Sequence, residues 1–228
     1  MCNRYETPQQ MDFEEFRVAP PTKAYKPAIG PRQDGPFIVD GRAVVGQWGM
    51  IEPGSPVRAP KAADGRIKAT NNARWESVRR LPTFRDSWAQ DRRCLIPARS
   101  FDEPYWGTGK NIWWRFRRTD GAPWAVAGLW SEWVDPESGE VVPNYTMITR
   151  NCDDHPLLGL MHKPEPGKPA DKQDKRTVVL LQPEDRQTWL TGSKEAAADL
   201  VAKLLPVEAF AHGAVDPAQQ VHLPIATA

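Results

Sequence analysis

The feature that most constrains the fold is a series of short segments rich in β-branched and aromatic residues. They are residues 94–97, 112–118, 124–133, 145–149 and 177–181. Such segments favour extended strands because branched and aromatic side chains pack well on a pleated surface. Thr119-Asp120-Gly121 supplies a tight turn between the second and third segments. The sequence therefore predicts a mainly antiparallel sheet.

The remaining elements are expected around this sheet. A hairpin is predicted at residues 37–39 and 43–48, around Asp40-Gly41. Helices are predicted at residues 12–18, 72–80, 83–90, 183–190 and 193–205. In this prediction Pro82 ends the second helix and Thr83 caps the third. No internal repeat or break in composition divides the chain, so we expect one α+β domain with peripheral helices over residues 2–205 and a C-terminal tail over residues 206–228.

Composition excludes several classes of protein. A chain of 228 residues that is 40% hydrophobic can bury a substantial core. No apolar run approaches the roughly 18 residues of a membrane helix, and residues 1–7 have no apolar signal region. Three cysteines do not indicate a disulfide scaffold. The expectation is a cytoplasmic protein without membrane contact.

The charges are unevenly distributed along the chain. Residues 66–118 hold thirteen Lys or Arg and five Asp or Glu, whereas the whole chain has a net charge of +1. Eleven of these cations are Arg, which suits bidentate phosphate contacts and stacking on bases. The segment is either the footprint of an anionic partner or a solvated surface balanced by the acidic remainder. Ten Trp residues are mostly expected in the core, with one or two available to stack on unpaired bases.

Cys2 is the most informative single residue. Removal of Met1, usual before a small second residue, would leave a 1,2-aminothiol, with an amine of pKa about 8 and a thiol of pKa about 8.5 on adjacent carbons. Both groups are nucleophiles, and together they can close a five-membered thiazolidine ring on an aldehyde. The alternative is that Cys2 is an accident of a frayed terminus.

Metal and cofactor chemistry find little support in the sequence. Cys152 and His155 resemble half of a metal site, but no second ligand pair follows, so no metal is expected. There is no phosphate-binding glycine loop, dinucleotide fingerprint or nucleophile elbow, and we expect no cofactor. Taken alone, Glu103 is an acid where a strand would end.

Several motifs together resemble one family. The chain begins Met1-Cys2-Asn3-Arg4-Tyr5, and further segments follow in the same order as in that family: Trp48-Gly49-Met50-Ile51, Asn72-Ala73-Arg74 with Glu76, Arg93-Cys94-Leu95-Ile96-Pro97-Ala98, Phe101-Asp102-Glu103, Ala127-Gly128-Leu129-Trp130, Thr146-Met147-Ile148-Thr149 and Met161-His162-Lys163-Pro164. The set resembles the SOS-response-associated peptidase (SRAP) family of abasic-site shield proteins. The resemblance implies a distorted antiparallel sheet or barrel.

The resemblance also implies a function. Such proteins bind single-stranded DNA, or a single-strand/double-strand junction, at a base-less deoxyribose. The amine of Cys2 would condense with the sugar aldehyde and its thiol would close the thiazolidine, giving a covalent DNA-protein crosslink that shields the lesion. A lyase side activity through the Schiff base and an autopeptidase activity are also implied. We expect a monomer that is nucleoid-associated when bound to DNA.

Site residues follow from the same resemblance. Cys2, Asn72, Glu103 and His162 form the expected catalytic set: Asn72 orients the amine and sugar, Glu103 shuttles protons, and His162 assists sugar-ring opening. The expected DNA-binding residues are Arg4, Arg74, Thr149 and Trp48. Arg4 and Arg74 would bind phosphates, Thr149 would contact the DNA backbone, and Trp48 would stack on the base beside the lesion.

The chain departs from the family pattern at three places. Asn3 replaces the usual Gly beside Cys2, and residues 164–176 replace a short turn after His162. Asp102 places a second carboxylate next to Glu103, where it either raises the pKa of one of the two or points to the opposite face of the strand.

Two other functions compete with the covalent shield. One is a cysteine peptidase whose nucleophile arises by self-processing; the sequence requires removal of Met1 alone, which general processing supplies. The other is a module that reads damaged or modified DNA without forming a bond.

Overall fold

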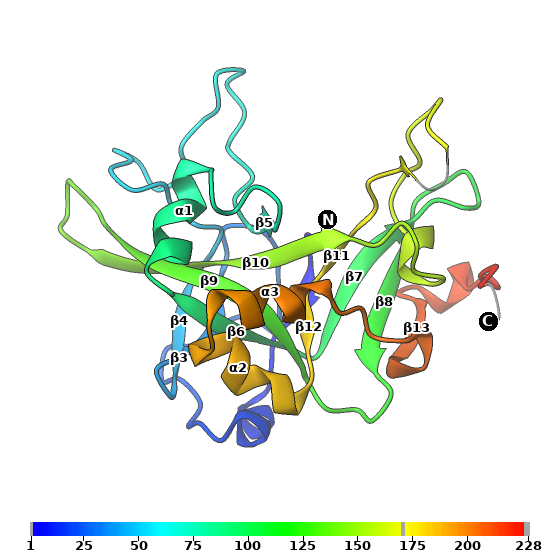
Figure 1. The fold of residues 1–228 in the computed structure, drawn as a ribbon, viewed down its shortest axis with the longest axis horizontal. Helices are drawn as coiled ribbons and strands as arrows, with labels where there is room; N and C mark the ends of the chain where they lie inside the picture. The colour runs from blue at the N-terminus through cyan, green and yellow to red at the C-terminus, as the bar shows by residue number, and fades with distance from the viewer. Residues whose placement is uncertain (1, 170–171, 226–228) are drawn as a thin grey trace.

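The computed structural model describes residues 2–169 and 172–225, which form two β-sheets with peripheral helices (Figure 1). The larger sheet has the order β11-β10-β4-β3-β6-β9-β12, and β5 pairs with β10 beside this path. Its strands are β3 (Asp34–Val39), β4 (Arg42–Trp48), β5 (Asn72–Arg74), β6 (Arg93–Ala98), β9 (Trp124–Val134), β10 (Val141–Asn151), β11 (Arg176–Val178) and β12 (Leu180–Leu181). Because β10 also pairs with β9, five of these strands close into a ring.

The smaller sheet has the order β13-β8-β7-β1-β2 and carries the N-terminal segment. Its strands are β1 (Tyr5–Glu6), β2 (Ala28–Ile29), β7 (Ser100–Tyr105), β8 (Ile112–Arg118) and β13 (Phe210–Ala214). Every pairing in this sheet is antiparallel. The predicted fold class, a single α+β domain built mainly on antiparallel sheet, is confirmed.

Helices lie around the two sheets. The longer ones are η1 (Gln10–Phe16), α1 (Pro82–Ala89), α2 (Arg186–Thr191) and α3 (Lys194–Ala202), and the single turns are η2 (Leu158–Leu160), η4 (Pro183–Asp185), η5 (Val207–Ala209) and η6 (Pro217–Gln219). α2 packs on β6 and on α3 (Figure 1). Ser193 caps α3 by accepting the N–H of Ala196, a standard N-cap bond.

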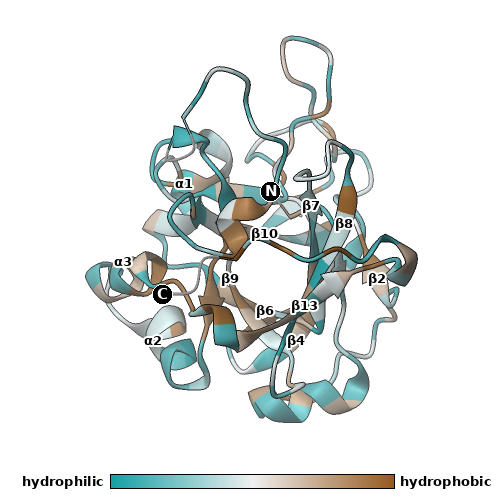
Figure 2. Ribbon diagram, turned by 90° about the vertical axis from the view of Figure 1, so that its right-hand side faces the viewer, coloured by the Kyte–Doolittle hydropathy of each residue, from teal (hydrophilic) through white to brown (hydrophobic). Residues whose placement is uncertain are grey.

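Strand β8 shows how the sequence directs side chains to the core. Trp114 and Phe116 are fully buried, whereas Trp113 and Arg117, on either side of them, are exposed. Successive side chains of a strand point to opposite faces, so this alternation gives the smaller sheet one apolar and one polar face. Residues 124–129, the first six of β9, do not alternate in this way, because all of them are buried. Figure 2 shows the hydropathy of each residue along the ribbon.

One predicted helix and the predicted start of another were wrong. Residues 72–80 are not a helix: Asn72–Arg74 form β5, which pairs in parallel with Met147–Thr149 of β10. Pairing with a neighbouring strand overrides the local helix preference of this segment. Pro82 begins α1 rather than ending a helix, because its missing N–H and fixed φ suit the first helical turn, and Leu81 takes the N-cap position that we expected for Thr83.

The predicted C-terminal tail also contains ordered structure. Phe210–Ala214 form β13, which pairs along its whole length with β8. Phe210 and Leu223 are buried in the main hydrophobic cluster. In the part of the chain that the structure describes, no helix is long and apolar enough to cross a membrane.

Candidate active site at the N-terminal cysteine

Cys2 lies inside the protein rather than at a frayed end. The segment Tyr5–Glu6 pairs with β7 on one side and β2 on the other, which anchors the residues just before it. Cys2 has no exposed surface, and its thiol donates to the carbonyl of Arg4 at 3.4 Å. The same carbonyl accepts the backbone N–H of Asp102 at 3.0 Å.

Two consecutive asparagines hold the backbone of Cys2. The Asn72 amide donates to the Cys2 carbonyl at 2.6 Å, and the Asn71 amide donates to the same carbonyl at 3.2 Å. Asn71 also donates to the Asn3 side-chain oxygen at 3.1 Å. The buried Oδ1 atom of Asn72 has no hydrogen-bond partner among the described residues, so it can accept a donor that enters the site.

Glu103 and His162 form an acid-base pair beside Cys2. Glu103 is 1% exposed on β7, and its carboxylate lies 3.5 Å from Nε2 of His162. His162 Nε2 also lies 2.8 Å from the carbonyl of Arg176. The His162 backbone N–H donates to Pro104 at 2.6 Å, and Lys175 Nζ donates to the His162 carbonyl at 2.6 Å. These contacts hold His162 at a left-handed φ of +65°.

The electrostatics of the site keep both the thiol and the imidazole neutral near pH 7. Burial raises the pKa of the Cys2 thiol well above its ordinary value, and the negative charge of Glu103 raises it further. Burial lowers the pKa of His162, although Glu103 opposes this shift. Glu103 is therefore close enough to influence the pKa of both groups. Because the thiol is neutral, it must lose its proton when it reacts with a substrate.

The four predicted catalytic residues come from β5, β7 and two coil segments far apart in the sequence, yet they lie around one point. Asn72 contacts Cys2 directly, Glu103 contacts His162, and Glu103 acts electrostatically on Cys2. The arrangement combines a nucleophile, an amide that orients it, and a pair of groups able to accept and donate protons.

The four residues expected to bind DNA are not equivalent. The Arg4 side chain is 49% exposed, and Arg74 is exposed beside Asp174 at 3.0 Å. Trp48 is fully buried: its indole N–H donates to the Asn71 carbonyl at 2.9 Å, and its ring packs edge-to-face on Tyr5. Its expected role as a stacking base contact is corrected to a structural one, because no face of the ring is accessible.

Thr149 requires a similar correction. It is 1% exposed, and its hydroxyl donates to the Ala73 carbonyl at 3.4 Å. The hydroxyl bridges β10 to β5 and does not face solvent, so in this conformation it supports the strand carrying Asn72 rather than reaching the DNA backbone.

Asp102 points to the face of β7 opposite Glu103. It is 1% exposed and accepts two hydrogen bonds from Arg115, at 2.7 and 2.8 Å, while Arg4 lies 3.5 Å away. Asp102 is thus paired with cations, and the alternation of the strand separates it from the acid-base pair.

The structure adds residues that sequence reasoning missed. Asn71 duplicates the contact of Asn72 with Cys2, and Lys175 and Arg176 hold His162. The doubled Asn71-Asn72 was a readable signal, whereas Lys175 lies at the end of a charged insertion whose path could not be inferred. Among the described residues no cluster of His, Cys, Asp or Glu could hold a metal. His155 is instead a structural side chain, because its Nδ1 accepts the N–H groups of Leu157 and Leu158.

The fold and this site together define a class of protein: a β-sheet domain with a buried cysteine at position 2, whose carbonyl accepts hydrogen bonds from two asparagine side chains. The family model for "SOS response associated peptidase (SRAP)" matches residues 1–220, and the chain belongs to that family. Membership supports a function associated with DNA damage, with DNA-related binding and a peptidase-like or DNA-processing role.

Solved structures agree with this assignment. A protein from Bordetella bronchiseptica is 35% identical, with a TM-score of 0.82 over 94% of this chain and all of that chain. A protein from Bacteroides thetaiotaomicron is 19% identical, with a TM-score of 0.76 over 94% of this chain and 92% of that one, which shows the shared fold. A phage-related protein from Bordetella bronchiseptica is 20% identical, with a TM-score of 0.58 over 94% of each chain. No match was found among curated proteins.

Proposed function

We propose that this protein captures abasic sites in DNA by forming a covalent thiazolidine with Cys2, once Met1 has been removed. The partner is single-stranded DNA, or a single-strand/double-strand junction, that contains a base-less deoxyribose. The adduct shields the lesion. We further propose that the protein acts as a cytoplasmic monomer that is nucleoid-associated when bound to DNA, without a metal or cofactor.

The observation that carries the proposal is the convergence of Cys2, Asn72, Glu103 and His162. An aminothiol needs three kinds of help to react with a sugar aldehyde: orientation of the amine, proton donation to the leaving oxygen, and removal of the thiol proton. Asn72 holds the Cys2 backbone at 2.6 Å, and Glu103 and His162 lie 3.5 Å apart. Burial of the site also limits hydrolysis of a reactive intermediate.

The chemical steps balance within these residues. In its neutral form, the Cys2 amine attacks C1′ of the open-chain sugar. Glu103 and His162 relay the two amine protons to the aldehyde oxygen, which leaves as water, and a C=N bond remains. The Cys2 sulfur then forms a bond to the same carbon as the C=N electron pair returns to nitrogen. The thiol proton passes by way of the Glu103 carboxylate to this nitrogen, which regenerates the carboxylate. The net change is the loss of one water molecule.

Arg4 and Arg74 are proposed to bind the flanking phosphates. Both are exposed at the rim of the site, and arginine suits bidentate phosphate contacts. In the free protein Arg74 is paired with Asp174 at 3.0 Å, so DNA must compete with this carboxylate for the guanidinium. Binding through Arg74 should therefore depend strongly on salt.

The decisive test compares wild type with Cys2→Ala and Cys2→Ser. Each protein, with loss of Met1 verified by mass, is mixed with single-stranded DNA bearing one abasic site and separated on a denaturing gel. Wild type should give a shifted band that requires the abasic site, and Cys2→Ala should give none. A shifted band with Cys2→Ala would overturn the mechanism.

The same gel separates the competing functions. Cys2→Ser and Cys2→Ala both retain the amine, so the lyase activity that we propose as a side reaction should persist in both as strand cleavage without a stable band. A module that only reads damaged DNA would bind in native gels and leave every denaturing lane unshifted. An autopeptidase acting through Cys2 would release Met1 itself, so the Cys2 variants would retain Met1 in the mass spectrum, whereas general processing would remove it from all three proteins.

A further inference from the structure

We propose that the outer face of the smaller sheet is a second binding segment for the lesion-bearing DNA strand, leading from the Cys2 site to a cavity near η1. This inference rests on the proposed function and extends it to the nucleotides that flank the lesion. It starts from the register of the sheet, which places several arginines on one face.

Strand register defines this outer face. Tyr5 pairs with Phe101, and Phe101 pairs with Phe116, and all three are fully buried. Their neighbours along each strand therefore point to the opposite, outer face. The neighbours that make up this face are Arg4, Glu6, Ser100, Asp102, Arg115 and Arg117.

On the outer face the acids lie beneath the arginines. The Asp102 side chain is 1% exposed and that of Glu6 is 28% exposed, whereas the side chains of Arg4 and Arg117 are 49% and 51% exposed. Arg115 bridges the two acids, with Glu6 at 2.5 Å and Asp102 at 2.7 Å. The surface that solvent meets is therefore cationic, even though the acids hold the guanidinium groups in fixed positions.

Glu6 remains ionised in this network. Burial raises its pKa, but the hydrogen bond from Ser100 and the charges of Arg115 and Arg117 outweigh burial, so the pKa lies below its ordinary value. Glu6 thus acts as a fixed anchor for Arg117, at 3.2 Å, near neutral pH.

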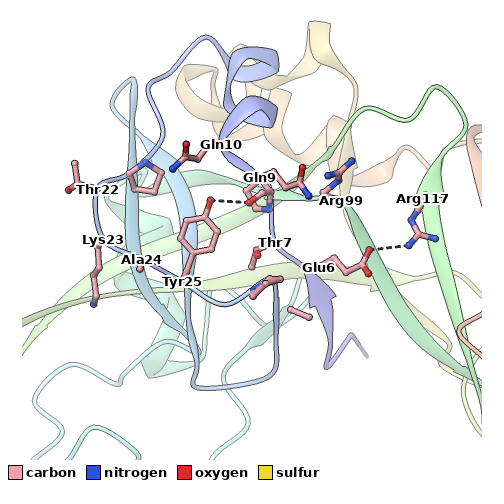
Figure 3. A pocket seen from close by; sticks show the side chains of 14 residues that line it. Glu6, Thr7, Gln9, Gln10, Thr22, Lys23, Ala24, Tyr25, Arg99 and Arg117 are labelled. Carbon is pink, nitrogen blue, oxygen red and sulfur yellow. Dashed lines mark hydrogen bonds and ion pairs between the residues drawn. The ribbon is translucent and has the colours of Figure 1, made fainter.

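The outer face ends in a cavity of about 730 Å³ (Figure 3). Arg117 and Arg99 lie on one side of this cavity, and Lys23 lies on the other. The ring of Tyr25 lies between them, with its hydroxyl donating to the Pro8 carbonyl at 2.9 Å. The volume falls within the usual range for small-ligand sites.

The chemistry of this cavity fits a nucleotide segment. Proteins that bind single strands without sequence preference combine cations that follow the phosphates with aromatic rings on which bases stack. Arg99 and Arg117 supply the cations, and Tyr25 supplies a partly buried ring whose hydroxyl is already satisfied.

The distance from the lesion site is suitable for the same strand. Glu6 lies four positions after Cys2 in the sequence, so the backbone between them spans at most about 13 Å. That length corresponds to about four nucleotides at the stacked spacing of about 3.4 Å per nucleotide. Arg4 lies between Cys2 and Glu6 in the sequence, and its side chain, 49% exposed, adds a cation to the outer face.

The test measures affinity as a function of strand length, with Cys2→Ala in every background so that no thiazolidine forms. Oligonucleotides carry one abasic site with two nucleotides on each side, or with eight on the 5′ side, or with eight on the 3′ side. The test variant is Arg99→Gln with Arg117→Gln. Fluorescence anisotropy is measured over a series of salt concentrations.

A matched control is available on α3. Lys194→Gln with Lys203→Gln removes the same charge from side chains of similar exposure, each also lying beside one carboxylate. Thermal melts of both double variants verify that each remains folded.

We expect extension on one side only to strengthen binding in the protein with both arginines. The arginine double variant should lose that gain, and its slope of log affinity against log salt should fall by about 1.4, since each phosphate contact on a single strand contributes about 0.7. The lysine control should match the parent protein.

Other outcomes would overturn the inference. Equal gains on both sides, or equal losses in the two double variants, would indicate only a general effect of charge. If the arginine double variant bound DNA as its parent does but no longer bound a glutamate-rich peptide that the parent binds, the cavity would be a peptide site. The covalent assay with the short oligonucleotide and an intact Cys2 is read separately, so failure of the proposed crosslink is distinguishable from failure of this binding segment.

Discussion

Replacing Asp102 with Asn should destabilise the protein more than its small change in shape suggests. The carboxylate is almost completely buried and accepts two hydrogen bonds from Arg115, at 2.7 and 2.8 Å. The amide of Asn has the same size but retains one acceptor oxygen and no charge. The Arg115 side chain is 14% exposed, so it would keep its charge in a largely desolvated position.

The magnitude follows from these contacts. Removing one partner of a buried ion pair costs about 3–5 kcal/mol. Arg115 retains Glu6 at 2.5 Å, and Asn can still accept one hydrogen bond, so the expected loss is about 2–3 kcal/mol in the free energy of unfolding. For a chain of this length that corresponds to a fall of about 4–12 °C in melting temperature.

Urea denaturation followed by tryptophan fluorescence measures this loss. The matched control is Glu6→Gln, which removes a carboxylate from the other side of Arg115 while Asp102 remains; Glu6 is more exposed, and we expect a loss of about 1 kcal/mol or less. The slope of the transition should not change in either variant. A loss for Asp102→Asn no larger than that of the control would refute the argument from burial and pairing.

Three further results are expected. Trp48→Phe should cost about 1.5–3 kcal/mol of stability, because it removes the bond to the Asn71 carbonyl and leaves unfilled volume, and the folded fraction should bind DNA as wild type does in anisotropy titrations. Because the pKa of Glu6 is lowered in the folded protein, its stabilising contribution is present above its unfolded value of 4.5 and lost as pH falls through the lower folded value; a Glu6→Gln variant should lack this part of the pH dependence of unfolding. Asn72→Ala should slow covalent capture about 5- to 100-fold at saturating DNA, the equivalent of about 1–3 kcal/mol of lost orientation, and an unchanged rate would remove Asn72 from the mechanism.

The sequence predicted strands with a clear side-chain pattern and missed those without one, for a physical reason. The segment at residues 112–118 has a clear alternation of large apolar and polar side chains, and it coincides with β8. Asn72–Arg74 has no such pattern, and its conformation depends on pairing with β10, a segment about 75 residues further along the chain. Local patterns carry no information about a partner so distant in sequence.

The candidate site shows the same division. An N-terminal aminothiol could be identified from Cys2 alone, because its chemistry depends on two adjacent groups. The role of Trp48 could not, since a tryptophan beside a basic segment is equally compatible with stacking on DNA and with burial. The position of Asp102 depended on which face of β7 it occupied, and only the pairing of β7 with β8 and β1 decided between the two alternatives.

Peptide mapping of the DNA adduct by mass spectrometry tests the central claim most directly. The N-terminal peptide that begins at Cys2 should carry the abasic nucleotide, with a mass equal to the sum of the two components minus one water, and it should form without a reducing agent. Treatment with borohydride should leave the mass unchanged, because a closed thiazolidine has no C=N bond to reduce. An adduct on a lysine, or one recovered only after borohydride reduction, would contradict the account.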